Sequence, residues 1–325
     1  MSANDVTTAM VWRSMIRSPI SLGFMLRRTI GALIALLGAV TIVFIMVNAT
    51  GNPAEVMAPL NATDADIARI SEQYGFDQPL YAQYFTFLGN VLTGDFPNSL
   101  YTNRPAFVEV IRRVPNTLLL SLSAVIIGSI VGLLVGYAAA MSRNALARSL
   151  PLRFLMLLQS MPSFFLGLLL ILIFSLTFPL LPTSGSGSWK HLVLPIATLS
   201  CFVAPNIARL FRSTINEMRH EEHVLTARAK GISETTVRIR HIAINALGPV
   251  VALIGLQAGG VLAGAVVTET VFAYPGLGEL LVRSVANRDY PVVLASVVFV
   301  CLGYVIASLA VDIIVAIIDP RVQKR

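Results

Sequence analysis

Six apolar stretches alternate with polar segments along the chain. Each is about 20 residues or longer, the length that a helix needs to cross a hydrocarbon core roughly 30 Å thick. They lie at about 29–48, 117–141, 154–178, 192–210, 247–267 and 292–318. The fourth is the weakest, because Pro195, Pro205 and Asn206 interrupt it. The pattern predicts an all-α polytopic membrane protein with six transmembrane helices.

Polar segments divide the rest of the chain. We predict a tail at 1–28, an outer region at 49–116, a core at 117–320 that includes a loop at 209–245, and a short end at 321–325. The outer region is long enough to form structure of its own and should be partly helical. Thr63 or Asp64 is a suitable N-cap for a helix there, with Ile67 and Ile70 on one face.

The distribution of positive charge predicts the orientation. Of the 24 Lys and Arg residues, 17 lie in the tail, in the loops at 141–153 and 209–245, and at 319–325. The positive-inside rule places these segments, and therefore both termini, in the cytoplasm. The first stretch follows four arginines and lacks a good cleavage site, which favours an uncleaved anchor over a signal peptide.

Composition and missing motifs narrow the function. Charged residues make up 13% of the chain, about half the usual share, and the net charge of +7 belongs to the cytoplasmic loops rather than to a nucleic-acid site. No phosphate-binding loop and no hydrolase or metalloprotease motif occurs. Cys201 and Cys301 lie in apolar stretches, and His220 and His223 lack a third ligand. We therefore expect neither a metal nor a cofactor in this chain.

Glycine and proline predict how the helices pack. Gly128, Gly132 and Gly136 recur every four residues, and small residues at this spacing let two helix backbones approach closely in lipid. Pro162 removes a backbone donor and should kink the third helix.

The loop at 209–245 is too long to be a mere connection. Five of its apolar residues fit one helical stripe: Ile215, Met218, Leu225, Ala229 and Ile232. Arg228 and Lys230 come in the last turn before a helix stop at Gly231, and Ser233 is a suitable N-cap for the next helix. Such a loop either rests on the lipid surface or docks into a cytoplasmic partner, and we favour docking.

Several segments resemble one transporter family. "TARAKGIS" followed by "RHIAINALGPVV" looks like the cytoplasmic loop of binding-protein-dependent ABC importer permeases, and "ETVFAYPGLGELLVRSVANRDYPVV" resembles the outer loop before their last helix. The first helix with its arginine pair and the segment "YGFDQPLYAQYFTFLGNVLTGDF" match as well, so that the resemblance covers about 300 residues. It is strongest to the first permease of the oligopeptide/dipeptide/nickel branch. That branch commonly lacks the glutamate of the general Glu-Ala-Ala pattern, as this chain does.

The resemblance implies a fold and partners. Such permeases have the type I ABC importer fold and form the translocation path with a second, homologous permease. Two ATP-binding subunits or one fused ATPase hold ATP and Mg, and an extracytoplasmic binding protein delivers peptide to the outer loops, here 50–116 and 270–290. The expected location is the bacterial cytoplasmic (inner) membrane.

Roles of single residues follow from the matching positions. The ATPase-coupling helix would comprise Leu225, Thr226, Ala227, Arg228, Ala229, Lys230, Gly231 and Ser233. Arg228 and Lys230 would meet acidic edges of an ATPase groove. The outer gate or binding-protein contact would comprise Glu269, Phe272, Tyr274, Pro275, Gly276 and Asp289. Candidates for the translocation path are Ser160, Asn206, Gln257, Gly260 and Gly264, for which ordinary packing between helices is the alternative.

We therefore expect the permease subunit of an importer of oligopeptides or dipeptides, which is not itself an enzyme. Nickel or another small solute is an alternative, because nickel relatives share the motifs. A self-contained channel or an ion-coupled carrier is less favoured, since only Asp312 lies well within a span, whereas ion-coupled carriers usually pair charges at mid-membrane. An intramembrane enzyme would need paired catalytic residues in facing spans, and the sequence offers none.

Overall fold

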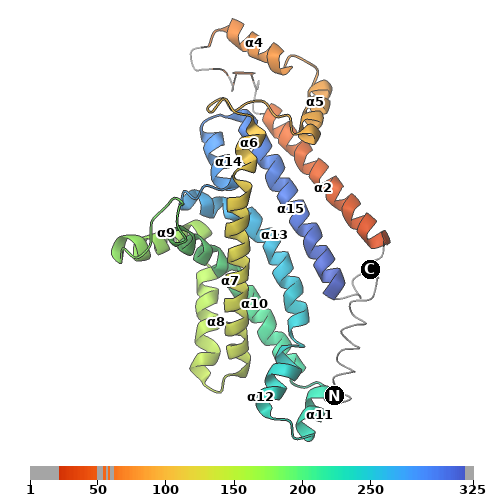
Figure 1. Cartoon of the computed structure of the whole chain (residues 1–325), viewed down its shortest axis with the longest axis vertical. Coiled ribbons are helices and arrows are strands. Elements are labelled where there is room, and N and C mark those ends of the chain that lie inside the picture. Colours follow the sequence, from red (N-terminus) through yellow and green to blue (C-terminus); the bar gives the residue numbers. More distant parts are fainter. Residues whose placement is uncertain (1–21, 50–53, 56–57, 59–61, 319–325) are drawn as a thin grey trace.

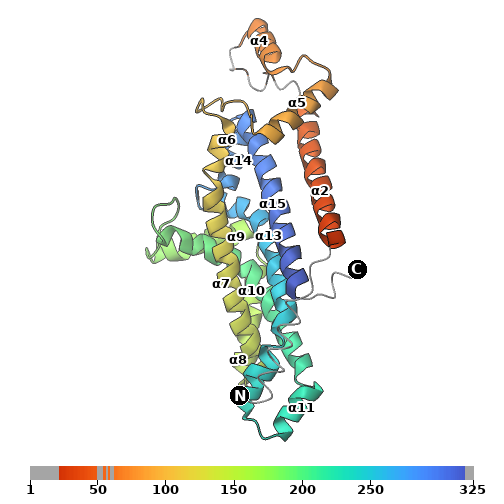
Figure 2. The same ribbon diagram turned by 45° about the vertical axis from the view of Figure 1, so that its right-hand side comes forward.

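Helices make up the described part of the molecule. The computed structural model describes residues 22–49, 54–55, 58 and 62–318, and within them the only β-type pairing is an isolated bridge between Asn98 and Pro105. The helices form an elongated bundle with a helical cap at one end and a small helical knob at the other (Figures 1 and 2). Most of the predicted tail, the end at 321–325 and the side chain of Asp312 lie outside the described residues.

Four single helices are long and apolar enough to cross a membrane. They are parts of α2 (Leu22–Ala49), α7 (Val114–Met141) with the short helix before it, α10 (Lys190–Met218) and α15 (Tyr290–Ile318). The number rises to six if each of two bent helix pairs counts as one span, as the sequence predicts. α2 begins at Leu22, inside the predicted tail, and α10 runs on to Met218, inside the predicted cytoplasmic loop.

The third predicted span is not one continuous helix. α8 (Ala145–Gln159) is followed by α9 (Ser163–Ile171) and the π-helix η1 (Leu172–Thr177), and the two parts are bent by 108°. Pro162 lies at the N-cap position of α9, so the predicted kink is confirmed. Its size was not predicted: α8 begins inside the predicted loop at 141–153, and α9 turns sideways from the bundle (Figure 1).

The fifth predicted span is also preceded by a bend. α13 (Leu247–Val271) meets the segment formed by α12 (Glu234–Thr236) and the π-helix η2 (Val237–Ala243) at 49°. Glu234, Arg238 and Arg240 are charged and at least partly exposed, which places α12 and η2 outside the membrane with the knob.

The predicted glycine packing is confirmed between α7 and α10. A Cβ atom on Gly132 would lie 2.7 Å from the carbonyl oxygen of Ala204, and one on Gly136 would lie 2.8 Å from that of Ala208. Because these neighbours are backbone atoms, only glycine permits the two helices to lie this close. The largest buried cluster of the protein surrounds the pair.

The outer region forms a cap of three helices, α4 (Asp64–Tyr74), α5 (Leu80–Thr93) and α6 (Ala106–Ile111). Thr63 begins α4 as predicted, with its side chain accepting from the Asp66 N–H while the Asp66 carboxylate accepts from the Thr63 N–H. The hydroxyl and backbone N–H of Thr63 lower the pKa of Asp66. α5 contacts the outer end of α2 through Tyr84, whose OH lies 2.7 Å from Thr41 Oγ1.

Candidate functional site

The knob consists of a helix, a glycine turn and a second helix, as predicted. α11 (Glu222–Ala229) ends at Gly231, whose φ of +74° is left-handed and whose N–H donates to the carbonyl of Arg228 at 2.9 Å. Ser233 then caps α12 by accepting a hydrogen bond from the N–H of Thr236.

One face of the knob is sealed by aliphatic side chains. Val224, Val237 and Ile242 are fully buried, and Ala227 is nearly so. The predicted single stripe is wrong, because α10 ends at Met218 and the chain turns before α11. Ile215 is buried with α10, whereas Leu225 and Ala229 face outward.

Leu225 is the large apolar residue that α11 exposes. Its exposed fraction is 55%, and the other outward residues of the predicted coupling helix are Thr226, Arg228, Ala229, Lys230, Gly231 and Ser233. Ala227 belongs to the sealed face instead. The knob therefore presents a small surface with one leucine at its centre and two positive charges beside it.

The two predicted positive charges differ in their contacts. The Arg228 guanidinium binds the Glu234 carboxylate through two hydrogen bonds of 3.2 Å, and Arg238 Nε lies 3.1 Å from the same carboxylate. These side-chain hydrogen bonds, first that of Arg228 and then that of Arg238, lower the pKa of Glu234. Arg228 is thus already paired within the knob, so docking on an acidic groove would exchange this contact, while Lys230 has no ion pair among the described residues. The predicted role of both charges stays a prediction.

The knob is also tied to the segment that enters α13. His223 Nε2 lies 3.1 Å from the carbonyl oxygen of His241, and the Asn245 side-chain amide donates to that oxygen at 2.7 Å. These contacts join α11 to the residues directly before α13.

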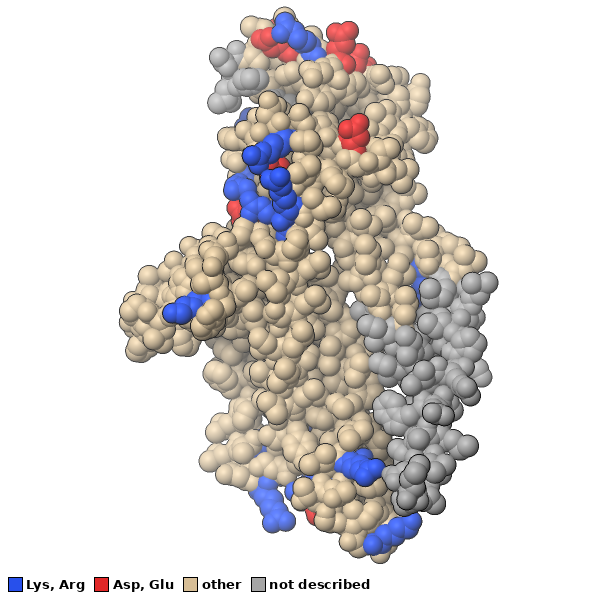
Figure 3. Space-filling view, in the orientation of Figure 1, with Lys and Arg blue, Asp and Glu red and all other residues tan. Residues whose placement is uncertain are grey.

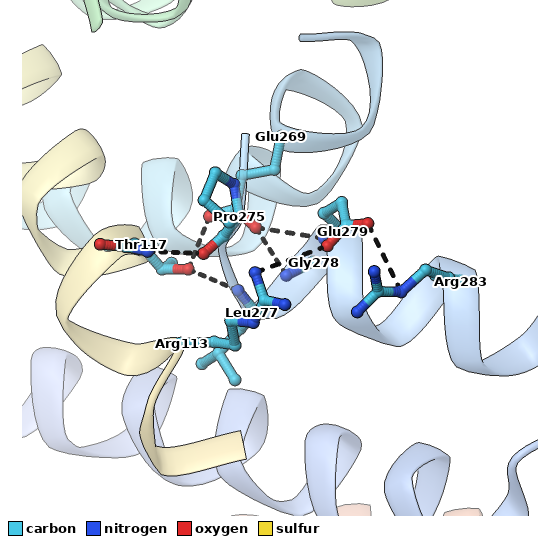
Figure 4. A network of polar contacts seen from close by, with 9 residues as sticks. Arg113, Thr117, Glu269, Pro275, Leu277, Gly278, Glu279 and Arg283 are labelled. Atoms are coloured by element: carbon cyan, nitrogen blue, oxygen red, sulfur yellow. Dashed lines mark hydrogen bonds and ion pairs between the residues drawn. The ribbon is translucent and has the colours of Figure 1, made fainter. Parts of the chain in front are cut away.

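The outer end of the bundle holds a buried carboxylate. Glu269, in the last turn of α13, is fully buried and accepts from Thr117 Oγ1 at 2.6 Å. It also accepts from the backbone N–H groups of Gly278 at 2.6 Å and Glu279 at 3.3 Å, in the first turn of α14 (Leu277–Ala286) (Figure 4). A carboxylate at a helix N-terminus satisfies free N–H groups and opposes the helix dipole favourably.

Further contacts close this network, which we call the outer latch. Thr117 Oγ1 accepts from the Leu277 N–H at 2.8 Å, so that one hydroxyl joins α7, α13 and α14. The Asn116 amide donates to the carbonyl of Pro275 at 2.7 Å. A Cβ on Gly276 would overlap the Glu269 carboxylate, and one on Gly278 would overlap the backbone of Val266.

Burial corrects part of the predicted role of the outer residues. Glu269, Phe272, Tyr274 and Gly276 are all buried, so in this conformation they do not form a surface for a delivery protein. Asp289 is 5% exposed and accepts from Ser99 Oγ at 2.5 Å and the Leu100 N–H at 3.1 Å. These residues hold the outer loops on the bundle, and Pro275 alone is partly exposed. The part of the prediction that makes them an outer gate stays a prediction.

The predicted path residues fall into two groups. The side-chain oxygen of Asn206 accepts hydrogen bonds from the amide of Gln159 at 3.2 Å and from the guanidinium of Arg209 at 2.7 Å. The side-chain amides of Asn206 and Gln257 both donate to the backbone carbonyl of Phe202. Gln159 and Arg209 were missed by the sequence reasoning, although Gln159 directly precedes the predicted kink.

The second group lacks such contacts. Gly260 and Gly264 lie on an exposed face of α13, where an added Cβ would meet nothing within 4 Å. Ser160, also exposed, bonds the Leu157 carbonyl at the end of α8.

This helical membrane architecture, with a helical knob at one end and a buried polar network at the other, is that of ABC importer permeases with the type I fold. The chain belongs to the family of binding-protein-dependent transport system inner membrane components, whose model matches residues 107–324. The model for the N-terminal part of such membrane components matches residues 21–121. Within this family it is a permease of the oligopeptide/dipeptide type.

Relatives and a solved structure agree with this assignment. The chain is 40% identical to the glutathione transport system permease protein GsiC of Salmonella paratyphi A over 305 residues, which cover 94% of this chain and 100% of the relative. The Escherichia coli protein of the same name is 38% identical with the same coverage. The MetNI methionine ABC transporter, in an inward-facing conformation, shares the fold with a TM-score of 0.54 at 19% identity, covering 66% of this chain and 98% of that chain.

Proposed function

We propose that this chain is one of two permeases in a peptide importer of the bacterial inner membrane, with both termini and the knob in the cytoplasm. A second, homologous permease completes the path. Two ATP-binding subunits or one fused ATPase bind ATP and Mg and dock on the knob, and an extracytoplasmic binding protein delivers the peptide. The excess of Lys and Arg in the segments on the knob side supports this orientation.

The observation that carries the proposal is the exposed Leu225 on a rigid knob. Its neighbours Val224 and Ala227 are buried, so the helix has a fixed orientation and presents the leucine outward. α11 lies at the far end of the bundle from the cap (Figure 1), away from the apolar spans. A protruding apolar residue on a preformed helix is typical of a side chain that fills a pocket of a partner protein.

The face of α13 supports a second permease. Gly260 and Gly264 are exposed within a membrane span, and small residues there permit close approach of another helix or of a solute. The side-chain amide of Gln257 lies on α13, and that of Asn206 lies on the neighbouring helix α10. One chain supplies only one wall of such a path.

A peptide is favoured as the solute. Side-chain amides both donate and accept hydrogen bonds, as the backbone of a peptide does, and Gln159, Asn206 and Gln257 form one connected group. The curated relatives named above are permeases of glutathione transport systems. Nickel or another small solute is the alternative, and competition for uptake between a labelled peptide and nickel distinguishes the two.

The first experiment isolates the chain from native membranes and identifies what accompanies it. We expect a second permease and ATP-binding subunits, and ATP-dependent peptide uptake after reconstitution with the binding protein. Leu225→Glu should remove the ATP-binding subunits and abolish uptake while the second permease stays bound.

Leu92→Glu is the matched control for subunit retention, because Leu92 is 87% exposed on α5 at the opposite end and its substitution should leave the ATP-binding subunits attached. Uptake without ATP by the isolated chain would overturn the proposal in favour of a channel. Retention of the ATP-binding subunits by Leu225→Glu would overturn the docking role alone.

A further inference from the structure

An apolar cavity of about 640 Å³ opens between α7, α13 and α15. Its lining begins at Ile111 and Val114 near the outer end and reaches Val251 and Ala310 at the inner end. The space-filling view shows this face of the molecule hollowed between α7 and α15 (Figure 3). Almost all lining residues are apolar, which excludes a peptide or an ion as the occupant.

The cavity is long enough to hold an acyl chain. On α7 the lining extends from Val114 to Val125, and on α15 from Phe299 to Ala310. Eleven helical steps of 1.5 Å give about 17 Å on each helix. The α7 stretch begins at the outer end of its helix and the α15 stretch lies nearer the inner end of its own. The cavity is therefore longer than half of a hydrocarbon core of roughly 30 Å and can hold an extended acyl chain that enters at the outer end.

A positive charge without an ion pair among the described residues follows the outer end of the lining in the chain. Arg112 directly follows the lining residue Ile111 and is exposed. Arg104 and Arg113 on either side of it lie 3.8 Å from Glu109 and 4.0 Å from Glu279, whereas Arg112 has no ion pair among the described residues. Figure 3 shows Lys and Arg gathered over α6 and α14 on the same face.

We propose that this cavity, the lipid groove, binds an anionic phospholipid of the outer leaflet. Its phosphate contacts Arg112, and one acyl chain lies between α7 and α15. The phosphate provides Arg112 with a negatively charged partner, and the acyl chain covers apolar side chains that would otherwise remain unpacked. Thr117, which lines the groove, also holds Glu269, so the bound lipid supports the helix that carries the outer latch.

The test uses the full importer in lipid nanodiscs with phosphatidylglycerol or phosphatidylethanolamine carrying a photoreactive acyl chain. We expect labelled peptides from α7 and α15, with phosphatidylglycerol preferred. Arg112→Gln should reduce that preference about fivefold, the factor that corresponds to roughly 1 kcal/mol for one arginine near an anionic surface. Gly303→Leu should block labelling by both lipids, because Gly303 lines the groove and an added Cβ meets nothing within 4 Å.

Two matched variants control for charge and for bulk. Lys190→Gln removes an exposed charge elsewhere, and Gly38→Leu adds the same bulk to α2, where an added Cβ also meets nothing within 4 Å. Both should label as the unchanged protein does. Equal labelling by the two lipids, or labelling that Gly303→Leu leaves intact, would overturn the proposal. So would a crosslink from Ala307→Cys to the second permease, which would identify a protein as the occupant.

Discussion

The outer latch and the knob are both turns between helices, but they are held by different forces. In the latch, the buried carboxylate of Glu269 accepts three hydrogen bonds and joins α7, α13 and α14. In the knob, the polar contacts of Glu234 are exposed, and the shape depends on buried Val224 and Val237.

This difference separates an anchor from a docking surface. A buried charge must keep its partners, because an unsatisfied donor or acceptor in the interior costs about 1–3 kcal/mol. Exposed ion pairs contribute much less, so the outer face of the knob is free to exchange its contacts for those of a partner. The protein is therefore fixed at the outer end and adaptable at the end where we propose that ATPases dock.

The largest expected effect comes from removing the anchor. Glu269→Ala leaves the Thr117 hydroxyl and the N–H groups of Gly278 and Glu279 without an acceptor. We expect a loss of about 3 kcal/mol or more in the free energy of unfolding, measured as a lower thermal unfolding midpoint of the purified chain. Glu279→Gln serves as the control, since Glu279 makes only long ion pairs of 3.7 and 4.0 Å. Equal midpoints for the two variants would mean that the latch is not an anchor.

A glycine in each region sharpens the comparison. Gly278→Ala places a Cβ against the Val266 backbone, which has no room to move, and should cost about 1–3 kcal/mol. Gly231→Ala meets no atom within 4 Å but imposes a φ of +74° on alanine, and should cost about 1 kcal/mol. Thermal unfolding of both variants shows which substitution costs more stability. A larger loss for Gly231→Ala would place the tighter constraint in the knob.

Local chemistry made the knob predictable from the sequence. The helix stop at Gly231 and the cap at Ser233 depend on residues that are next to one another in the chain. The close approach of α7 and α10 at Gly132, outside the knob, depends on a fixed spacing of glycines. The 108° bend at Pro162 was underestimated, because a proline predicts a kink but the angle depends on what the following helix packs against.

The sequence predicted only part of the outer latch. Glu269 and Gly276 were selected through resemblance, but nothing local shows that the Glu269 carboxylate turns back to cap α14. Its partner Thr117 lies 152 positions away in the chain and has no distinguishing signal of its own. The pairing of Arg228 with Glu234 was missed for the opposite reason, since both residues are surface charges with many available partners.

A smaller effect on stability, but a clear one on transport, is expected at Lys230. Lys230→Glu changes an exposed charge that has no ion pair among the described residues, so the unfolding midpoint should not change. If Lys230 meets an acidic edge of an ATPase, peptide uptake by the reconstituted importer should fall and ATP hydrolysis should lose its dependence on the binding protein.

Arg228→Glu is the informative companion variant, because it also removes the ion pair with Glu234 and places like charges together. It should lower the unfolding midpoint as well as uptake. Normal uptake by Lys230→Glu would contradict a role of this charge in docking.

The smallest expected effect is the pH dependence of the knob. The pKa of Glu234 is lowered in the folded protein by hydrogen bonds from Arg228 and Arg238. Its stabilising contribution is therefore complete above the ordinary glutamate pKa of about 4.5 and is lost as the pH falls through the lowered folded value. Glu234→Gln should unfold at a slightly lower temperature than the unchanged protein at pH 7, and this difference should disappear in acid. A difference that persisted in acid would mean that Glu234 acts through its shape rather than its charge, and the knob would then resemble the outer latch more closely than its exposure suggests.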